Sequence, residues 1–501
     1  MLTALVLAPT AVALLLLALP ARTPVRVPRA LWVAATAAEL GLVVAVWAGY
    51  EPGGGIQYEV RARWIPQAGV GYHVGVDGLS LPLLALTCVL FLVCALYSLR
   101  ENRRLPVFAA LFLFLQTTCL GLFVALDLIL FFVFFDLSIV AMYFVIAGWG
   151  HRDAGPAALK FFLYTFLGSL ALLLGFIGLY LAAAPHTFDM VDLARQNPLA
   201  GRSAPAALIL LAVVVGLAIK TPTVPFHTWL PPAHTEAPAA GSAILAGVLL
   251  KMGTYGFLRI AMPLLPEAWR RYALVLVVVG VLSVLHGALV ALAQTDFKRM
   301  IAYTSVNHMG YILLGIGAAA TTADTSAQAR SLAVTGSVTQ MVSHGLITGA
   351  LFLLAGVLYE RGRTHDMGAY GGVAATAPVF AVLTGAAAFA SLGLPGFSGF
   401  IAEFQILTGS LGPRPLATAL SVLGILLTAG LFLRALRTVL MGPLRLPRPS
   451  GTPRAFPDLR AHEYAAVVPL LVLAVVLGIA PRFLLDVIEP ASHTLLELLA
   501  R

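Results

Sequence analysis

Four ionisable side chains lie within long apolar segments of the sequence. A charge near the middle of a membrane helix costs on the order of 3 kcal/mol on insertion scales, so such residues normally face the bundle interior and have a function there. Buried amines and carboxylates bind or release a proton according to the charge of their neighbours. Proton translocation is therefore the chemistry expected of Asp136, Lys220, Lys251 and Glu403.

The use of lysine supports this interpretation. The chain has only four lysines among its 31 basic residues, and two of them, Lys220 and Lys251, lie in apolar segments. A desolvated lysine can lose its proton, whereas a guanidinium group stays charged. A site that alternates between protonated and neutral states requires lysine, while the alternative, a structural salt bridge, would accept arginine equally well.

Histidines in or beside the same segments could extend a proton path, because imidazole titrates near neutral pH. We expect a relay of His227, His234, His308 and His344. His286 is the weakest candidate, since nothing in its surrounding sequence suggests a partner. The alternative for each is a hydrogen-bonded packing residue, and no spacing resembles a zinc site.

Long apolar segments must position these groups. The chain is 60% apolar and 11% charged, and its apolar residues form runs of the roughly 20 residues that a helix needs to cross a bilayer. The sequence predicts an all-α polytopic membrane protein with about 14 transmembrane helices. The predicted spans are 2–19, 30–50, 78–99, 106–126, 128–149, 158–182, 205–229, 236–261, 272–293, 300–319, 331–358, 374–409, 416–440 and 463–486.

Basic residues lie in alternate connections between these spans, which explains the net charge of +9 better than a nucleic-acid partner does. The positive-inside rule places these connections in the cytoplasm. Both termini should then lie outside, which requires an even number of helices. The connections that carry these clusters of basic residues have their first basic residue at Arg22, Arg100, Lys298, Arg361 and Arg434.

Helix-breaking residues interrupt the seventh span, after Lys220, and the twelfth, at 392–399. Each break alone could be a packing kink, but matched breaks five helices apart are typical of inverted repeats that line an ion path. We therefore predict one membrane domain with two inverted five-helix repeats and broken helices 7 and 12. Its parts are helices 1–3 (1–105), helices 4–8 (106–262), helices 9–13 (263–441), and a C-terminal loop with helix 14 (442–501).

Three further acidic residues have other expected roles. Asp77 and Asp127 begin predicted spans, where carboxylates favour helix N-termini, so we interpret them as structural. Glu39 lies in an apolar run of an early span, and we expect it to contact a neighbouring subunit. The three cysteines lack disulfide or metal-ligand spacing and should be core residues.

Seven segments carry a resemblance to a known family. They are VDGLSLPL (76–83), AMYFVIAGWG (141–150), AIKTPTVPFHTWLPPAHTEAP (218–238), AGVLLKMGTYG (246–256), IAYTSVNHMG (301–310), SHGL (343–346) and GLPGFSGFIAEF (393–404). The sequence resembles, nearly end to end, the antiporter-like, proton-translocating subunit M family of bacterial NADH:quinone oxidoreductase, respiratory complex I.

The resemblance implies a seventh-span lysine paired with a carboxylate on span five, and a polar axis continued by an eighth-span lysine and a twelfth-span carboxylate. Lys220, Lys251 and Glu403 occupy three of these positions. Span five has Asp136 where the family normally has glutamate. Because aspartate is one methylene shorter, the distance or hydration of its pair with Lys220 should differ.

The resemblance also implies the setting in which the chain acts. It would lie in the bacterial inner membrane beside neighbouring antiporter-like and other membrane subunits, and connect indirectly to a peripheral NADH-oxidising arm. No cofactor is expected in this chain, because FMN, iron–sulfur clusters and quinone would belong to partner subunits. Quinone reduction there would supply the energy.

The expected mechanism is electrostatic. A unit charge about 4 Å away is worth roughly 4 kcal/mol at an effective dielectric constant near 20, so the carboxylate of Asp136 can hold a proton on Lys220. When that interaction changes, the proton would pass through Lys251 and the histidines toward Glu403. The alternatives are a subunit of a multi-subunit sodium/proton antiporter or a membrane-bound hydrogenase, and a scaffold that conducts nothing.

Overall fold

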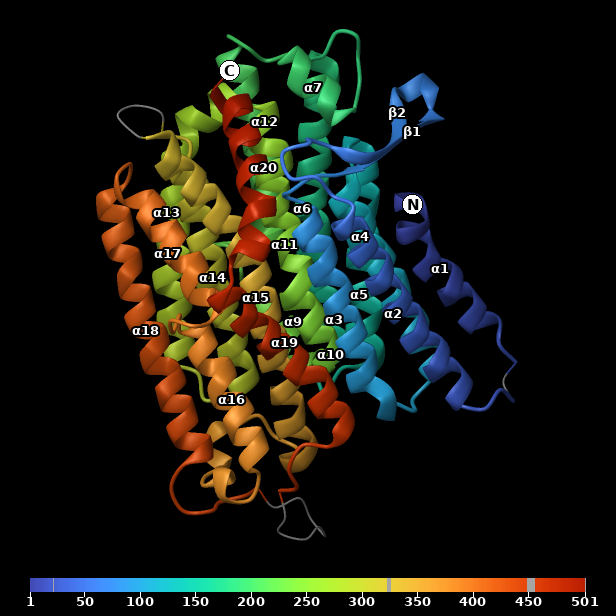
Figure 1. The fold of residues 1–501 in the computed structure, drawn as a ribbon, viewed down its shortest axis with the longest axis vertical. Coiled ribbons are helices and arrows are strands. Elements are labelled where there is room, and N and C mark those ends of the chain that lie inside the picture. Colours follow the sequence, from blue (N-terminus) through green and yellow to red (C-terminus); the bar gives the residue numbers. More distant parts are fainter. Residues whose placement is uncertain (21, 322–325, 448–455, 501) are drawn as a thin grey trace.

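The structure is a computed structural model that describes residues 1–20, 22–321, 326–447 and 456–500. It is a bundle of helices with one small β-hairpin (Figure 1). The elements are α1 (Leu2–Ala18), α2 (Arg26–Ala48), β1 (Gln57–Ile65), β2 (Val70–Val76), α3 (Leu81–Tyr97), α4 (Leu105–Val124), α5 (Leu128–Trp149), α6 (Ala154–Ala182), α7 (Met190–Gln196), α8 (Ser203–Lys220), α9 (Leu230–Glu236), α10 (Ala239–Ile244), α11 (Leu250–Gly256), α12 (Met262–Leu264), α13 (Pro266–Leu292), α14 (Phe297–Ala318), α15 (Ala327–Gly362), α16 (Pro378–Ser391), α17 (Ser398–Leu411), α18 (Pro415–Leu440), α19 (Ala461–Ile479) and α20 (Arg482–Ala500).

The helical membrane class is confirmed. Within the described residues, 11 helices are long and apolar enough to cross a membrane. The three other predicted spans coincide with α1, with α14, and with the broken pair α16 and α17. The first has 17 residues, the second carries many polar side chains, and each half of the broken pair has 14 residues. The count of fourteen spans stays a prediction.

Both predicted helix breaks are present. Helix α8 ends at Lys220 and α9 begins at Leu230, while α16 ends at Ser391 and α17 begins at Ser398. A third irregularity was not predicted: π-helical turns at 245–249 and 257–261 flank α11. Such turns occur frequently at functional sites, and these two flank the helix that carries Lys251.

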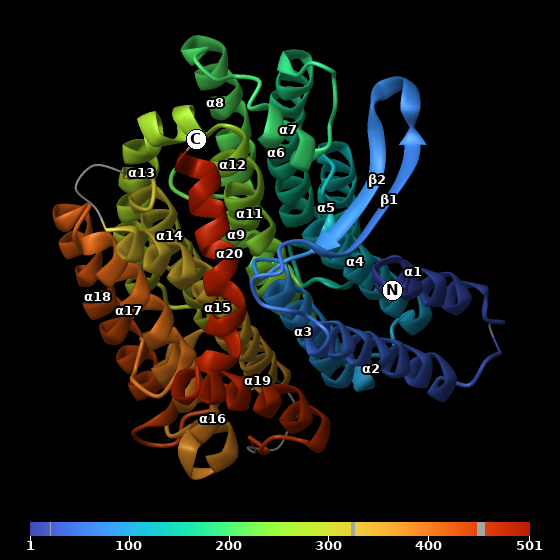
Figure 2. The same cartoon turned by 45° about the horizontal axis from the view of Figure 1, so that its top comes forward.

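Helix α15 forms the centre of the bundle. It has 36 residues, and all of those from Ala333 to Leu358 are buried. It packs against α14, α17, α19, α10 and α3. Figures 1 and 2 show it surrounded by helices from both halves of the chain, with α18 at one edge and α1 and α2 at the opposite edge. Side chains on α15 are therefore in position to join the two predicted repeats.

The region between α2 and α3 departs from the all-α expectation. It forms the antiparallel hairpin of β1 and β2, which projects from the bundle on the side of α7 (Figure 2). The Nδ1 atom of His73 lies 2.6 Å from Asp189, its Nε2 atom lies 2.8 Å from Glu59, and Arg61 lies 2.9 Å from Asp189. These polar contacts attach the hairpin to the start of α7.

The C-terminal region also differs from the expected span 463–486. Helix α19 ends at Ile479, just before Pro481, and a second helix, α20, continues to Ala500. Helix α20 is amphipathic: leucine, isoleucine and valine side chains are buried along one face. The sequence pattern that we interpreted as the end of one span therefore belongs to two helices.

The three acidic residues outside the predicted site have defined positions. Asp127 caps α5 by accepting hydrogen bonds from the N–H groups of Ile129 and Leu130, and Asp77 forms a 2.5 Å ion pair with Arg259, so the structural interpretation of both is confirmed. Glu39 is only 2% exposed within this single chain. The expected contact of Glu39 with a neighbouring subunit is therefore wrong.

Replacing Asp127 by alanine should destabilise the fold. The carboxylate accepts hydrogen bonds from three backbone N–H groups, two in α5 and that of Gly71 in the hairpin. We expect Asp127→Ala to lower the free energy of unfolding by about 2 kcal/mol, measured by denaturant titration in mixed micelles. Asp153 precedes α6 without making a side-chain cap bond, so Asp153→Ala is the matched control. Equal losses in both variants would contradict the capping role.

Candidate functional site

The first group of buried polar residues lies between α8 and α5. Lys220 is 1% exposed; its amine donates a hydrogen bond to Ser138 Oγ at 3.1 Å and lies 4.7 Å from the centre of the Phe135 ring. Within the described residues, no carboxylate lies within 4.0 Å of this amine. Its nearest polar partner is therefore a neutral hydroxyl group.

The expected pair of Asp136 with Lys220 is not formed as a direct ion pair. Asp136 and Ser138 are two residues apart on α5, and side chains with that spacing point to different faces of a helix. Ser138 faces Lys220, whereas the Oδ1 atom of Asp136 is buried without a hydrogen-bond partner in the described part of the chain. In this structure the carboxylate acts on Lys220 through space.

The second group centres on Lys251 in α11. Lys251 is fully buried, and its Nζ atom donates to the carbonyl of Ala246 at 2.5 Å and lies 2.6 Å from Nδ1 of His344 on α15. A protonated amine has only donors, so when Lys251 carries its proton, Nδ1 of His344 accepts and the imidazole proton resides on Nε2. That Nε2 atom is buried and has no other partner in the described chain.

The same group continues from α15 to α14 and α17. The rings of His344 and His308 are 5.3 Å apart between centroids. His308 Nε2 lies 3.2 Å from the carbonyl of Ser391 and 3.7 Å from Oε1 of Glu403. Because Nε2 donates to that carbonyl, Nδ1 of His308 is the acceptor. Lys251, His344, His308 and Glu403 thus form one contiguous cluster.

A small cavity of about 10 Å³ lies within this cluster and is bounded by His308, His344, Gln340 and Glu403, among others. This volume is near the smallest that holds a water molecule. A water there would bridge the 3.7 Å between His308 and Glu403, which is too long for a direct hydrogen bond.

The remaining histidines are placed differently. His227, in the break after α8, lies 3.2 Å from His286 of α13 between their Nε2 atoms. Sequence reasoning ranked His286 last, and no local signal could have found a partner 59 residues away. His234 stacks on Phe352 with ring centroids 4.4 Å apart, and neither of its ring nitrogens has a hydrogen-bond partner in the described residues.

Close packing brings α11, which carries Lys251, against the end of α8, which carries Lys220. A Cβ atom added to Gly253 in α11 would lie 2.3 Å from Oγ1 of Thr221 and 2.8 Å from the carbonyl of Leu217 in α8. Only glycine permits this approach. Thr221, directly after Lys220, and Gly253, two residues after Lys251, therefore lie at one contact. No hydrogen bond of the described chain joins the two amines.

Comparison with known proteins gives the family. The model of the transmembrane NADH:quinone oxidoreductase/Mrp antiporter family matches residues 125–428. The chain belongs to this family. The match includes all four predicted proton-carrying residues and both helix breaks, so the polar clusters lie in the part that defines the family.

Individual relatives of this antiporter family agree. The chain is 39% identical over 444 residues to NADH-quinone oxidoreductase subunit M of Rickettsia bellii, covering 88% of this chain and 86% of that protein. It is 36% identical over 479 residues to subunit M of Rhodobacter capsulatus, covering 93% and 90%.

Solved structures show the same architecture. A chain of respiratory complex I from Thermus thermophilus with bound NADH matches with a TM-score of 0.88 and 31% identity over 100% of both chains. A chain of the Mrp complex from Dietzia sp. has a TM-score of 0.86 at 23% identity and covers 99% and 98%. The second match shows the shared fold alone.

Removing the Ser138 hydroxyl should isolate the Lys220 amine. We expect Ser138→Ala to lower the free energy of unfolding by about 1–3 kcal/mol, because a buried charged donor loses its partner. Ser421→Ala is the control, since the Ser421 hydroxyl bonds only a carbonyl of its own helix. The measurement is denaturant unfolding in mixed micelles. If both variants lose the same stability, the Ser138 contact does not stabilise Lys220.

Proposed function

We propose that this chain translocates protons as subunit M of a bacterial NADH:quinone oxidoreductase. The observation that carries the proposal is the contiguous buried cluster of Lys251, His344, His308 and Glu403, since adjacent titratable groups inside a membrane bundle are typical of proton relays. The identity of 36–39% to subunit M over most of the chain supports the choice of complex.

Proton transfer within the cluster follows from its hydrogen bonds. The ammonium of Lys251 gives a proton to Nδ1 of His344, and the proton on Nε2 of His344 leaves toward Nδ1 of His308. The ring of His308 takes up that proton on Nδ1 and releases the one on Nε2 to Glu403 through a bridging water. Each histidine returns to a neutral ring with its proton on the other nitrogen.

Lys220 and Asp136 control the other half of the proposed path, which is the part outside the cluster of Lys251, His344, His308 and Glu403. The protonated amine of Lys220 is stabilised by the Ser138 hydroxyl and by the carboxylate of Asp136 acting through space. A change in the Asp136 charge alters the proton affinity of Lys220. His227, together with His286, extends this half beyond the α8 break, and His234 lies between the halves as a neutral carrier.

The proposal places the rest of the machinery in other chains. Quinone reduction in partner subunits, with their FMN and iron–sulfur clusters, would supply the energy. Neighbouring antiporter-like subunits and the bilayer of the bacterial inner membrane would surround this chain, with both termini outside. The fold shared with the Mrp complex keeps a sodium/proton antiporter subunit as the second candidate.

Substituting the buried lysines should abolish coupled activity. We expect Lys220→Ala and Lys251→Ala to reduce NADH-driven proton pumping in inverted membrane vesicles about tenfold or more, and Lys251→Arg to fail as well, because arginine does not release its proton. Lys160→Ala is the matched control, since Lys160 is exposed on α6. Full pumping by assembled Lys220→Ala and Lys251→Ala complexes would instead favour the non-conducting scaffold.

Purification should distinguish the two complexes. A tag on this chain is expected to recover flavin- and iron–sulfur-containing NADH-oxidising subunits from solubilised membranes, measured by flavin absorbance and NADH oxidation. Recovery of antiporter-like subunits alone, with sodium-dependent proton exchange that needs no NADH, would overturn the respiratory assignment in favour of the antiporter.

A further inference from the structure

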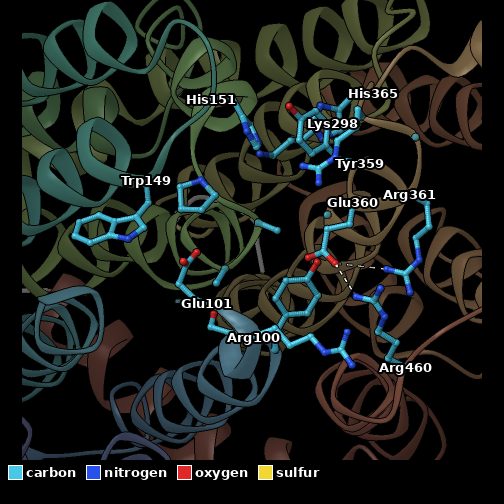
Figure 3. Close-up of a pocket in the computed structure, with 18 of the residues that line it drawn as sticks. Arg100, Glu101, Trp149, His151, Lys298, Tyr359, Glu360, Arg361, His365 and Arg460 are labelled. Carbon is cyan, nitrogen blue, oxygen red and sulfur yellow. Dashed lines mark ion pairs between the residues drawn. The ribbon is translucent and has the colours of Figure 1, made fainter. Parts of the chain in front are cut away.

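A cavity of about 710 Å³ lies at the end of the bundle where basic residues are concentrated, and none of the proposed proton-carrying residues lines it. It forms where α3 and α5 end and where α10 and α14 begin, and the end of α15 and residues 446, 447, 456, 457 and 460 complete its wall. Figure 3 shows the side chains that line this cavity. Its volume is within the range of about 300–1,000 Å³ that is usual for small-molecule sites.

The carboxylates at this cavity are already engaged. Glu360 lies 3.6 Å from Arg361 and 3.7 Å from Arg460, as the dashed lines in Figure 3 show. Glu463 behind the wall binds Arg361 through two contacts of 2.5 and 2.6 Å, and Glu101 accepts the backbone N–H groups of residues 102 and 103.

Three cations of the wall remain without such partners. Within the described residues, Arg100, Arg363 and Lys298 have no carboxylate within 4.0 Å, and the amine of Lys298 donates only to the carbonyls of Ala237 and Thr235. Lys298 is 1% exposed. Arg100 and Arg363, in contrast, are exposed. The cavity wall therefore presents two solvent-exposed guanidinium groups and one buried amine to a ligand.

Two histidines line the cavity beside Lys298, as Figure 3 shows. His151 and His365 flank the ring of Tyr359, with centroid distances of 4.4 and 4.6 Å. Burial, followed by the charge of Lys298, lowers the pKa of His365 to about 2. Burial, followed by the charges of Lys298 and Arg363, lowers the pKa of His151 to about 4. Both rings are neutral at pH 7 and can donate an N–H group to an anion.

Apolar side chains also line the cavity. Phe108 and Trp149 pack together with ring centroids 5.1 Å apart, Leu446 and Phe456 lie after α18, and the indole N–H of Trp149 is already bonded to the carbonyl of Arg103. A ligand that fits this lining has an anionic head and an apolar body.

We propose that this cavity binds a phosphate ester whose anionic head contacts Arg363 and Lys298, beside His151 and His365, and whose apolar body contacts Phe108 and Trp149. Arg100, at the other end of the cavity, adds to its positive charge. Arginine suits phosphate because its planar guanidinium donates two parallel hydrogen bonds. Basic pockets at the cytoplasmic ends of membrane helices bind anionic lipid headgroups. The expected source of the phosphate is therefore an anionic phospholipid, and a soluble nucleotide shares the same chemistry.

The test measures binding and does not depend on proton transfer. The full chain, purified in non-ionic detergent, is titrated with short-chain phosphatidylglycerol, with phosphatidylcholine of the same acyl length, and with ADP, and the thermal unfolding midpoint is followed. We expect stabilisation by phosphatidylglycerol over phosphatidylcholine, with binding at least about tenfold weaker in the double variant Arg100→Ala/Arg363→Ala.

The matched control is Arg26→Ala/Arg437→Ala, since both arginines are exposed and lie outside the cavity wall; its affinity should not change. Stabilisation by ADP alone, lost in the cavity variant, supports the site with a soluble phosphate as its source. The proposal is overturned if neither phosphatidylglycerol nor ADP stabilises the chain more than phosphatidylcholine does, or if the cavity variant and the control respond equally.

Discussion

The arrangement of this protein depends on the burial of two amines that have no direct carboxylate partner among the described residues. Lys220 and Lys251 are almost completely removed from solvent, and their hydrogen bonds go to a hydroxyl, a carbonyl and an imidazole. A buried charge without a counter-ion is strongly disfavoured, while the neutral amine accepts burial. A close ion pair would fix the proton on each lysine, whereas neutral partners leave both protonation states accessible.

Irregular helices make this burial possible. Lys220 lies where α8 ends, and Lys251 lies between two π-helical turns. An irregular backbone frees carbonyl groups, and that of Ala246 accepts a hydrogen bond from Lys251. Such backbone is tolerated at membrane depth only where protein covers it or where it lines a polar path. The same breaks that weaken the helices therefore supply the polar atoms that the lysines need.

Much of this could be predicted from the sequence, because charges and helix breakers inside apolar runs are local signals. The buried lysines, Glu403 and the breaks after α8 and α16 are visible in that way. Pairings across the fold are not local. Ser138 meets Lys220 from 82 residues away, and His344 meets Lys251 from 93 residues away, so the sequence gives no means of choosing them among similar residues.

Other differences have equally physical origins. No predicted span covers the segment between α2 and α3, yet its strands are held by His73 and Arg61 against Asp189, another distant contact. The predicted span 463–486 continues beyond Ile479, where α19 ends, because apolar residues continue past Pro481. Hydrophobicity alone does not separate a spanning helix from an amphipathic helix that follows it. Asp136 kept its expected helix but not its expected partner, because helical geometry turns Ser138, rather than Asp136, toward Lys220.

Proton translocation as proposed requires the two lysine groups to communicate, although no hydrogen bond of the described residues joins their amines. Gly253 packs α11 against the end of α8, but it lies two residues from Lys251, and side chains with that spacing point to different faces of a helix. The amine of Lys251 accordingly meets His344 on α15. The proposed path therefore leaves Lys251 on the side away from α8, and its direction is set by the face of α11 that offers an acceptor.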